Sequence, residues 1–162
     1  MECIDGRADG AGLRVGLVAA RFNDLIVDRL LEGALGALRQ HGVDDDDVVV
    51  VRVPGAVEVP LLAQVLADRD DIDAVVALGC VIRGSTSHYD VVCSMVASGV
   101  TRVTLDASKP VIFGVLTTDT AEQAFARARP EEGDKGGDAA RAALEMISVL
   151  RQLDDLLPAD TQ

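Results

Sequence analysis

The stretch AVVALGCVIRGSTSHYD, from Ala74 to Asp90, decides the fold that this sequence predicts. It begins with an apolar run, Ala74 to Leu78, that is typical of a strand buried in a parallel sheet. A loop of glycine and hydroxyl residues follows, and the apolar spacing of Tyr89 to Val100 then predicts a helix. A strand that leads through a loop into a helix is the repeating unit of α/β proteins, so the stretch indicates a parallel sheet.

The same alternation of strand and helix continues on both sides of this stretch. Three further strands are expected at residues 13–19, 48–51 and 111–116, and four further helices at residues 23–42, 61–67, 120–128 and 139–153. The side-chain oxygen of Asn23 is expected to cap the first helix and Gly42 to end it, while Thr120 to Gln123 form a capping-box pattern. The β-branched run Val48 to Val51 is expected to be covered on both faces. Parallel strands need right-handed crossovers, so we predict a three-layer α/β/α sandwich with a central parallel four-stranded sheet.

Length, composition and charge indicate one globular domain that avoids nucleic acid and membranes. The chain has 162 residues, of which 49% are hydrophobic and 26% charged, and no flexible linker divides it. Its 15 basic and 27 acidic residues give a net charge of −12, which repels nucleic acid and anionic lipid. The longest apolar stretch, Ala74 to Ile82, is about half as long as a bilayer span.

Cysteine and histidine usage indicates neither disulfides nor a metal site. Cys3, Cys80 and Cys93 show neither a disulfide framework nor the spacing of a zinc site. Two isolated histidines, His41 and His88, make no metal cluster. Because free thiols fit a reducing compartment, we place the protein in the cytoplasm.

Polar or flexible residues follow each predicted strand. These segments are Arg21 to Asn23, Pro54 to Glu58, Gly79 to Asp90 and Thr117 to Asp119. Ligands of parallel α/β sheets bind beyond the carboxyl ends of the strands. The four segments are therefore expected to converge on one edge of the sheet and to form the binding site there.

The segment after the third predicted strand contains candidates for anion binding and proton transfer. Ser85 and Thr86 supply hydroxyl and N–H groups just before a helix, where an anion such as phosphate binds favourably. The alternative is that they only cap this helix. His88 lies in the first turn, where the positive helix end favours the neutral imidazole. It is a candidate general acid/base, the alternative being no role in the chemistry.

Other candidate residues are aromatic, acidic or basic. Phe22, in a loop of a chain with few aromatic residues, suits stacking on a flat heterocycle. Glu58 either accepts hydrogen bonds from a polyol or favours the start of its helix. Phe113, taken alone, fits core packing. Arg127 and Lys135 are among the few cations of this chain. The alternatives to a role in the site are that Arg127 stabilises the negative end of a helix dipole and that Lys135 forms a surface ion pair.

Five separated motifs resemble lumazine synthases in their order and spacing. They are RFN at 21–23, PGAVEVP at 54–60, GCVIRGSTSHYD at 79–90, PVIFGVLTTDT at 110–120, and QAFARA with DKG within 123–136. The resemblance implies a transferase that acts at the penultimate step of riboflavin synthesis. There, 5-amino-6-(D-ribitylamino)uracil condenses with 3,4-dihydroxy-2-butanone 4-phosphate to give 6,7-dimethyl-8-ribityllumazine, phosphate and water. No metal and no organic cofactor are implied.

The resemblance also implies roles for individual residues. His88 matches the proton-transfer residue, Arg127 the phosphate-binding arginine and Lys135 a basic residue near the same pocket, and these three form the expected catalytic set. Phe113 matches a pocket residue contributed across a subunit boundary. The remaining substrate-binding residues are expected to be Phe22 on the pyrimidine, Ala56, Val57 and Glu58 on the ribityl chain, Cys80, Val81 and Ile82 on the uracil, and Ser85 and Thr86 on the phosphate.

For the whole chain, the resemblance implies one flavodoxin-like lumazine synthase domain over residues 1–162. Residues 1–12 would form an N-terminal arm and residues 154–162 a C-terminal tail. The arm, which by itself is expected to fray, would add a strand to a neighbouring subunit. Homopentameric rings are implied, as are icosahedral shells of sixty chains, with riboflavin synthase as a candidate partner. Val57, where an aromatic residue is common, and Asp134, in place of the usual Asn, depart from the family pattern.

Two rival functions are compatible with the same residues. A cysteine-dependent hydrolase would use Cys80 as nucleophile and His88 as base, although no helix N-terminus activates this thiol. A non-catalytic flavin- or pterin-binding shell protein would keep the pocket without turnover. In each case small molecules and further copies of the chain are the expected partners.

Overall fold

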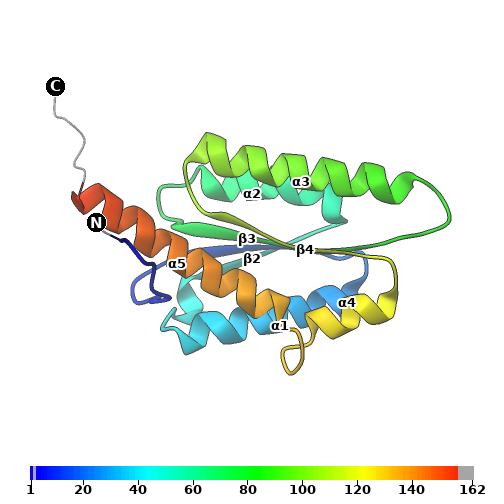
Figure 1. Ribbon diagram of the computed structural model, residues 1–162, viewed down its shortest axis with the longest axis horizontal. Coiled ribbons are helices and arrows are strands. Elements are labelled where there is room, and N and C mark those ends of the chain that lie inside the picture. The colour runs from blue at the N-terminus through cyan, green and yellow to red at the C-terminus, as the bar shows by residue number, and fades with distance from the viewer. Residues whose placement is uncertain (2, 157–162) are drawn as a thin grey trace.

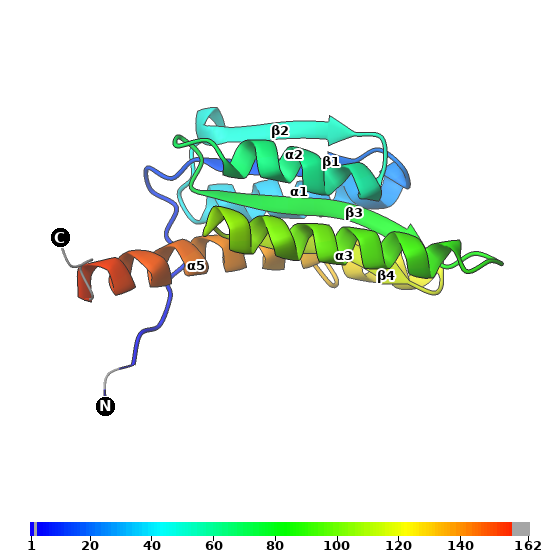
Figure 2. The ribbon, with the colours of Figure 1, turned by 90° about the horizontal axis from the view of Figure 1, so that it is seen from above.

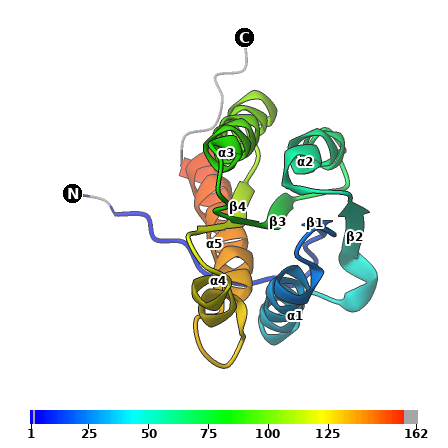
Figure 3. The same cartoon turned by 90° about the vertical axis from the view of Figure 1, so that its right-hand side faces the viewer.

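The computed structural model describes residue 1 and residues 3–156, which form a three-layer α/β/α sandwich (Figure 1). The strands are β1 Val15–Ala20, β2 Val48–Val53, β3 Ala74–Ile82 and β4 Val111–Thr118, and the helices are α1 Asp24–Gln40, α2 Val59–Ala67, α3 His88–Ala107, α4 Ala121–Ala128 and α5 Lys135–Leu156. All strands are parallel, in the order β2, β1, β3, β4. Seen end-on, α1, α4 and α5 cover one face and α2 and α3 the other (Figure 3). The predicted fold class is confirmed.

The two faces of the sheet carry separate hydrophobic cores. Leu17, Leu30 and Leu144 belong to the core under α1 and α5. Val18 and Val100 belong to the core under α2 and α3. Because successive strand residues point to opposite faces, the neighbours Leu17 and Val18 serve different cores. This double burial holds β1 and β3 rigidly at the centre of the sheet.

All four strands differ from the predicted bounds by one or more residues, and β4 includes Thr117 and Thr118, which were expected to follow it. β3 continues through Ile82, which pairs with Thr118, so four residues expected in a loop belong to the strand. β2 lies at the sheet edge (Figure 2), and its Val50 is 41% exposed. The expectation that Val48 to Val51 is covered on both faces is therefore wrong for the single chain, because a β-branched run has the same appearance at an edge as at the centre.

Two helices are longer than their apolar spacing indicates. α3 reaches Ala107 and buries Val96, Val100 and Val103, whereas Met95 of the same helix is 53% exposed. α5 ends at Leu156, so residues 154–156 of the expected tail are helical, and residues 157–162 of that tail lie outside the described residues. Among the described residues, no helix combines the length and the apolar character needed to cross a membrane.

The expected capping box of α4 is confirmed, whereas the expected cap of α1 is wrong. Thr120 Oγ1 accepts a hydrogen bond from the Gln123 N–H at 3.2 Å, and Gln123 Oε1 accepts one from the Thr120 N–H. Asn23 precedes α1 in the left-handed region at φ 59°, but its side chain does not cap the helix. Its Nδ2 instead donates to the Cys80 carbonyl in β3 at 2.9 Å. A tertiary contact has replaced the local one.

The N-terminal arm packs against the chain's own helices, so the expected fraying is wrong for its described part. The Gly10 N–H donates to the His41 carbonyl at 2.8 Å, and His41 Nδ1 lies 2.9 Å from the Ala8 carbonyl oxygen. Gln152 of α5 donates to the Asp5 carbonyl at 3.0 Å. None of the described arm residues is in a strand, and the addition of the arm to a neighbouring sheet stays a prediction.

Glycines allow α1 and α5 to approach one another closely. A Cβ atom at Gly136, near the start of α5, would collide with the backbone carbonyl of Leu30 in α1. Gly36, on the exposed side of α1, has no atom within 4 Å of the position its Cβ would occupy. The start of α5 is therefore fixed against α1 by a contact that only a residue without a side chain permits.

We predict that Gly136→Ala lowers the free energy of unfolding by about 1–3 kcal/mol, because α5 must move away from α1. Gly36→Ala is the matched control, and it is expected to raise the same free energy by up to about 1 kcal/mol, since alanine is the better helix former. Chemical denaturation at one chain concentration measures both. Changes of the same sign and size would contradict the close-packing role of Gly136.

Candidate functional site

A pocket of about 410 Å³ lies where the carboxyl ends of β1, β2 and β3 meet. This volume is in the range of small-molecule sites. Four segments far apart in the sequence line it, namely the loops after β1 and β2, the end of β3 and the start of α3. The lining residues are Phe22, Asn23, Gly55, Ala56, Val57, Glu58, Cys80, Val81, Ile82, Gly84, Thr86, His88, Tyr89 and Val92. The predicted convergence of strand ends is confirmed for these segments.

The loops after β1 and β2 are fastened to one another by backbone hydrogen bonds. The Arg21 N–H donates to the Val53 carbonyl at 2.8 Å, and the Phe22 N–H donates to the Pro54 carbonyl at 3.0 Å. The Phe22 side chain is therefore held at the pocket mouth, where it is 72% exposed. A large apolar ring held in solvent has no role in the core of this chain, and it offers a flat surface for stacking.

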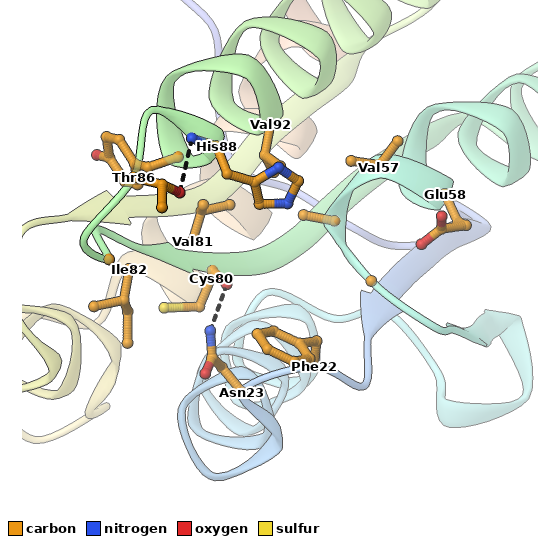
Figure 4. Close-up of a pocket in the computed structure, with 14 residues that line it drawn as sticks. Phe22, Asn23, Val57, Glu58, Cys80, Val81, Ile82, Thr86, His88 and Val92 are labelled. Atoms are coloured by element: carbon orange, nitrogen blue, oxygen red, sulfur yellow. Dashed lines mark hydrogen bonds between the residues drawn. The ribbon is translucent and has the colours of Figure 1, made fainter.

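The hydrogen bond from Asn23 to Cys80 links the β1–α1 loop to the end of β3 (Figure 4). The left-handed backbone of Asn23 turns its side chain toward β3, a conformation that asparagine tolerates better than most residues. Cys80, Val81 and Ile82, the last three residues of β3, all line the pocket. The sequence prediction missed this linking role of Asn23.

The loop between β3 and α3 presents hydrogen-bond donors at the pocket. His88 donates its backbone N–H to Thr86 Oγ1 at 3.3 Å. Within the part of the chain that the structure describes, the N–H groups of Gly84, Ser85 and Thr86 have no protein acceptor. Free N–H donors just ahead of a long helix form an environment that favours an anion.

The His88 ring lies on the α3 side of the pocket, while Phe22 and Asn23 lie on the side of the β1–α1 loop (Figure 4). His88 is exposed, so a ligand in the pocket can reach its ring nitrogens. Tyr89 and Val92, which the prediction missed, line the pocket together with His88. Helical spacing could have indicated Val92 as a pocket residue, because residues 88 and 92 share one face of α3.

Four of the expected site residues do not line this pocket. Phe113, which is 42% exposed, and Lys135 share a second, open hollow over β4 and α5. The Arg127 guanidinium donates to the Gln123 carbonyl of its own helix at 3.1 Å. Ser85 belongs to the loop but does not line the pocket. A single chain thus brings together Phe22, the 56–58 turn, the 80–82 strand end, Thr86 and His88, but not Phe113, Arg127 or Lys135.

Within the described residues, no group of three or more His, Cys, Asp or Glu side chains is placed to hold a metal ion. Cys80 is 3% exposed, and burial raises the pKa of its thiol to about 11. Very little thiolate exists at neutral pH under these conditions, and the thiolate is the reactive form.

A family model for 6,7-dimethyl-8-ribityllumazine synthase matches residues 12–151. The chain belongs to this family. The protein is therefore a transferase of riboflavin biosynthesis, and the matched range contains every pocket residue described above together with Phe113, Arg127 and Lys135. Membership of the lumazine synthase family overturns both rival functions, the cysteine-dependent hydrolase and the non-catalytic binding protein. The protonated Cys80 thiol is the physical reason against the hydrolase.

We predict that Cys80→Ala retains turnover within a few-fold of the wild-type enzyme, because the thiol takes no part in bond formation. In the native lumazine synthase, Cys80 is expected to react with iodoacetamide roughly 100-fold more slowly than in the urea-unfolded chain at pH 8. Peptide mass spectrometry follows the modification site by site. Loss of turnover in Cys80→Ala with an unchanged melting temperature would show that the thiol takes part in the reaction.

Proposed function

We propose that this lumazine synthase condenses 5-amino-6-(D-ribitylamino)uracil with 3,4-dihydroxy-2-butanone 4-phosphate, which gives 6,7-dimethyl-8-ribityllumazine, phosphate and water. The observation that carries the proposal is the pocket itself. It combines an exposed ring at Phe22, a carboxylate at Glu58, free N–H donors at residues 84–86 and an accessible imidazole at His88. A flat polar heterocycle, a polyol chain and a phosphate need this set of groups.

The uracil substrate is proposed to lie between the Phe22 ring and the end of β3. Stacking on Phe22 holds its flat face, and the backbone of residues 80–82 reads its polar edge. The ribityl chain then extends along the turn formed by Ala56, Val57 and Glu58, where the exposed carboxylate of Glu58 accepts hydrogen bonds from hydroxyl groups. Val57 supplies a smaller wall than an aromatic residue would.

The butanone phosphate is proposed to bind the loop before α3. The free N–H groups of residues 84–86, the Thr86 hydroxyl and the helix start favour an anion. Ser85 does not line the pocket of the single chain, and its proposed contribution is the free N–H group of the same loop. Arg127, Lys135 and Phe113 join the site from a neighbouring chain, since they lie apart from the pocket within one chain.

His88 is proposed to transfer protons at the atoms that change bonding. The uracil amine adds to the butanone carbonyl and the adduct loses water to form an imine, and phosphate is then eliminated. The ribityl-bearing amine attacks the carbonyl that this elimination leaves, and a second water is lost as the ring closes. Each step moves a proton that an imidazole next to both substrates can accept or return. Holding the substrates together supplies much of the acceleration, because it replaces a bimolecular encounter.

We predict that His88→Ala lowers kcat by about 100-fold, at the low end of general acid–base catalysis, while both KM values stay within about threefold. Lumazine absorbance measures turnover. The melting temperature is the control, and it is expected to stay unchanged because the His88 side chain is exposed. A full kcat in this variant would assign the acceleration to proximity alone.

The proposed assembly is a pentamer in which neighbouring chains share sites, and twelve such rings are proposed to close into a shell of sixty chains. Large apolar side chains stay exposed along the outer sides of α2 and α3, which a ring would cover. They are Leu61, Val65, Val91, Met95 and Leu105. Association with riboflavin synthase is proposed for the shell only. The net charge of −12 per chain opposes assembly at low ionic strength.

Mixed assemblies test the shared site. His88→Ala and Arg127→Ser chains are each expected to be nearly inactive, the second through a raised KM for the butanone phosphate. Refolded together in equal amounts, they are expected to recover about a quarter of wild-type activity, because one site in four then takes both intact residues from adjacent chains. Each variant refolded alone is the control. No recovery despite confirmed mixed rings would show that one chain supplies both residues.

We propose that the enzyme is located in the cytoplasm, on the basis of its cysteine thiols. Cys3, Cys80 and Cys93 are all unpaired, and Cys3 is exposed. Exposed free thiols persist in a reducing compartment.

A further inference from the structure

Arg83 lies between two pocket-lining residues but does not line the pocket itself. Ile82 and Gly84 face the pocket, whereas Arg83 is on the opposite side of the extended chain. Its backbone N–H donates to the Thr118 carbonyl at 2.9 Å, which continues the pairing of β3 with β4 by one residue. The side chain is therefore directed at the end of β4 and the start of α3.

The Arg83 guanidinium contacts three side chains on these two elements. Nε donates to Asp119 Oδ1, just beyond β4, at 2.8 Å, and Nη1 lies 3.4 Å from Asp90 Oδ1 in the first turn of α3. Its central carbon lies 4.2 Å from the centre of the Tyr89 ring, within the range of a cation–π contact. Arg83 thus links the end of β4 to the start of α3, and loop residues 84–87 lie between Arg83 and α3.

The loop has few other restraints. Its N–H groups at residues 84–86 have no protein acceptor among the described residues, and residues 84–88 are all exposed. Arg83 is also 44% exposed and Asp119 66%, so their ion pair adds little to global stability. The cluster acts locally, because it sets the distance between the two ends of the four-residue loop and the direction of the loop's N–H donors.

We propose that Arg83 is a positioning residue, which through Asp119, Asp90 and Tyr89 holds the 84–87 loop in the conformation that binds the phosphate group. This rests on the proposed assignment of the butanone phosphate to that loop. Arg83 does not bind the phosphate itself, because its guanidinium is held by two carboxylates on the side away from the pocket. Preorganised donors bind more tightly because less ordering is needed on binding.

Steady-state kinetics on Arg83→Gln tests the proposal. We expect the KM for the butanone phosphate to rise about five- to tenfold, with the KM for the uracil, kcat and the melting temperature nearly unchanged. Arg83→Lys is expected to raise this KM less than Arg83→Gln does, since lysine keeps the positive charge but lacks the forked guanidinium. Arg102→Gln is the matched control, because Arg102 also pairs with an aspartate on α3, at the far end of the helix. Equal rises in both KM values, or a lowered melting temperature, would overturn the positioning role.

Asp119→Asn separates positioning from direct binding. If Arg83 acts through Asp119, this variant raises the KM for the phosphate substrate as Arg83→Gln does, and the double variant is no worse than either single one. If Arg83 instead contacts the phosphate, removal of the competing carboxylate frees the guanidinium and lowers that KM, which would overturn the proposal.

Calorimetry with inorganic phosphate distinguishes failure of this inference from failure of the proposed function. We expect Arg83→Gln to bind phosphate about five- to tenfold more weakly than the wild-type protein. If the wild-type protein does not turn over the two substrates, the proposed reaction fails, and the phosphate titration still decides the role of Arg83. Equal phosphate affinity in both proteins would overturn that role.

Discussion

The pairing of β3 with a strand on each side is the constraint on which the fold and the pocket both depend. β1 pairs with one edge of β3 and β4 with the other, and the second pairing continues to Ile82. The pairing with β1 ends at Leu78, so the last residues of β3 have one free edge, which faces the pocket, while β4 holds them from the other side. The Asn23 side chain is fastened to the Cys80 carbonyl, and the Arg83 N–H to the Thr118 carbonyl. Both neighbouring loops are thereby positioned from the same strand.

Local features could be predicted from the sequence, and features that depend on distant contacts could not. The capping box of Thr120 uses residues within one turn, so its pattern was enough. The edge position of β2 depends on strand order, which Val48 to Val51 do not encode locally. The same reason explains Asn23, whose side chain bonds to β3 and not to its own helix. Tertiary contacts decided each of these differences.

The site residues divide in the same way, into those that could be located from the sequence and those that could not. The rule that ligands bind beyond parallel strand ends located Phe22, the 56–58 turn and His88 without knowledge of the structure. Phe113, Arg127 and Lys135 received their roles in the site from the family resemblance, and they lie elsewhere on the chain. In the proposed assembly a neighbouring chain brings them to the pocket, and periodicity within one chain does not specify such an arrangement. A site shared in this way would make activity depend on assembly.

The acidity of the chain restricts how it can bind a phosphate. Cations around the loops are largely neutralised, because Arg83 pairs with Asp90 and Asp119, and Lys135 pairs with Asp138 at 2.7 Å. Lys135 and Arg141 in turn hold the pKa of Asp138 below its ordinary value. Arg127 forms no ion pair within the described residues, so its charge is available. At the proposed phosphate site, uncharged N–H donors and the guanidinium of Arg127 would thus take the place of a cluster of cations.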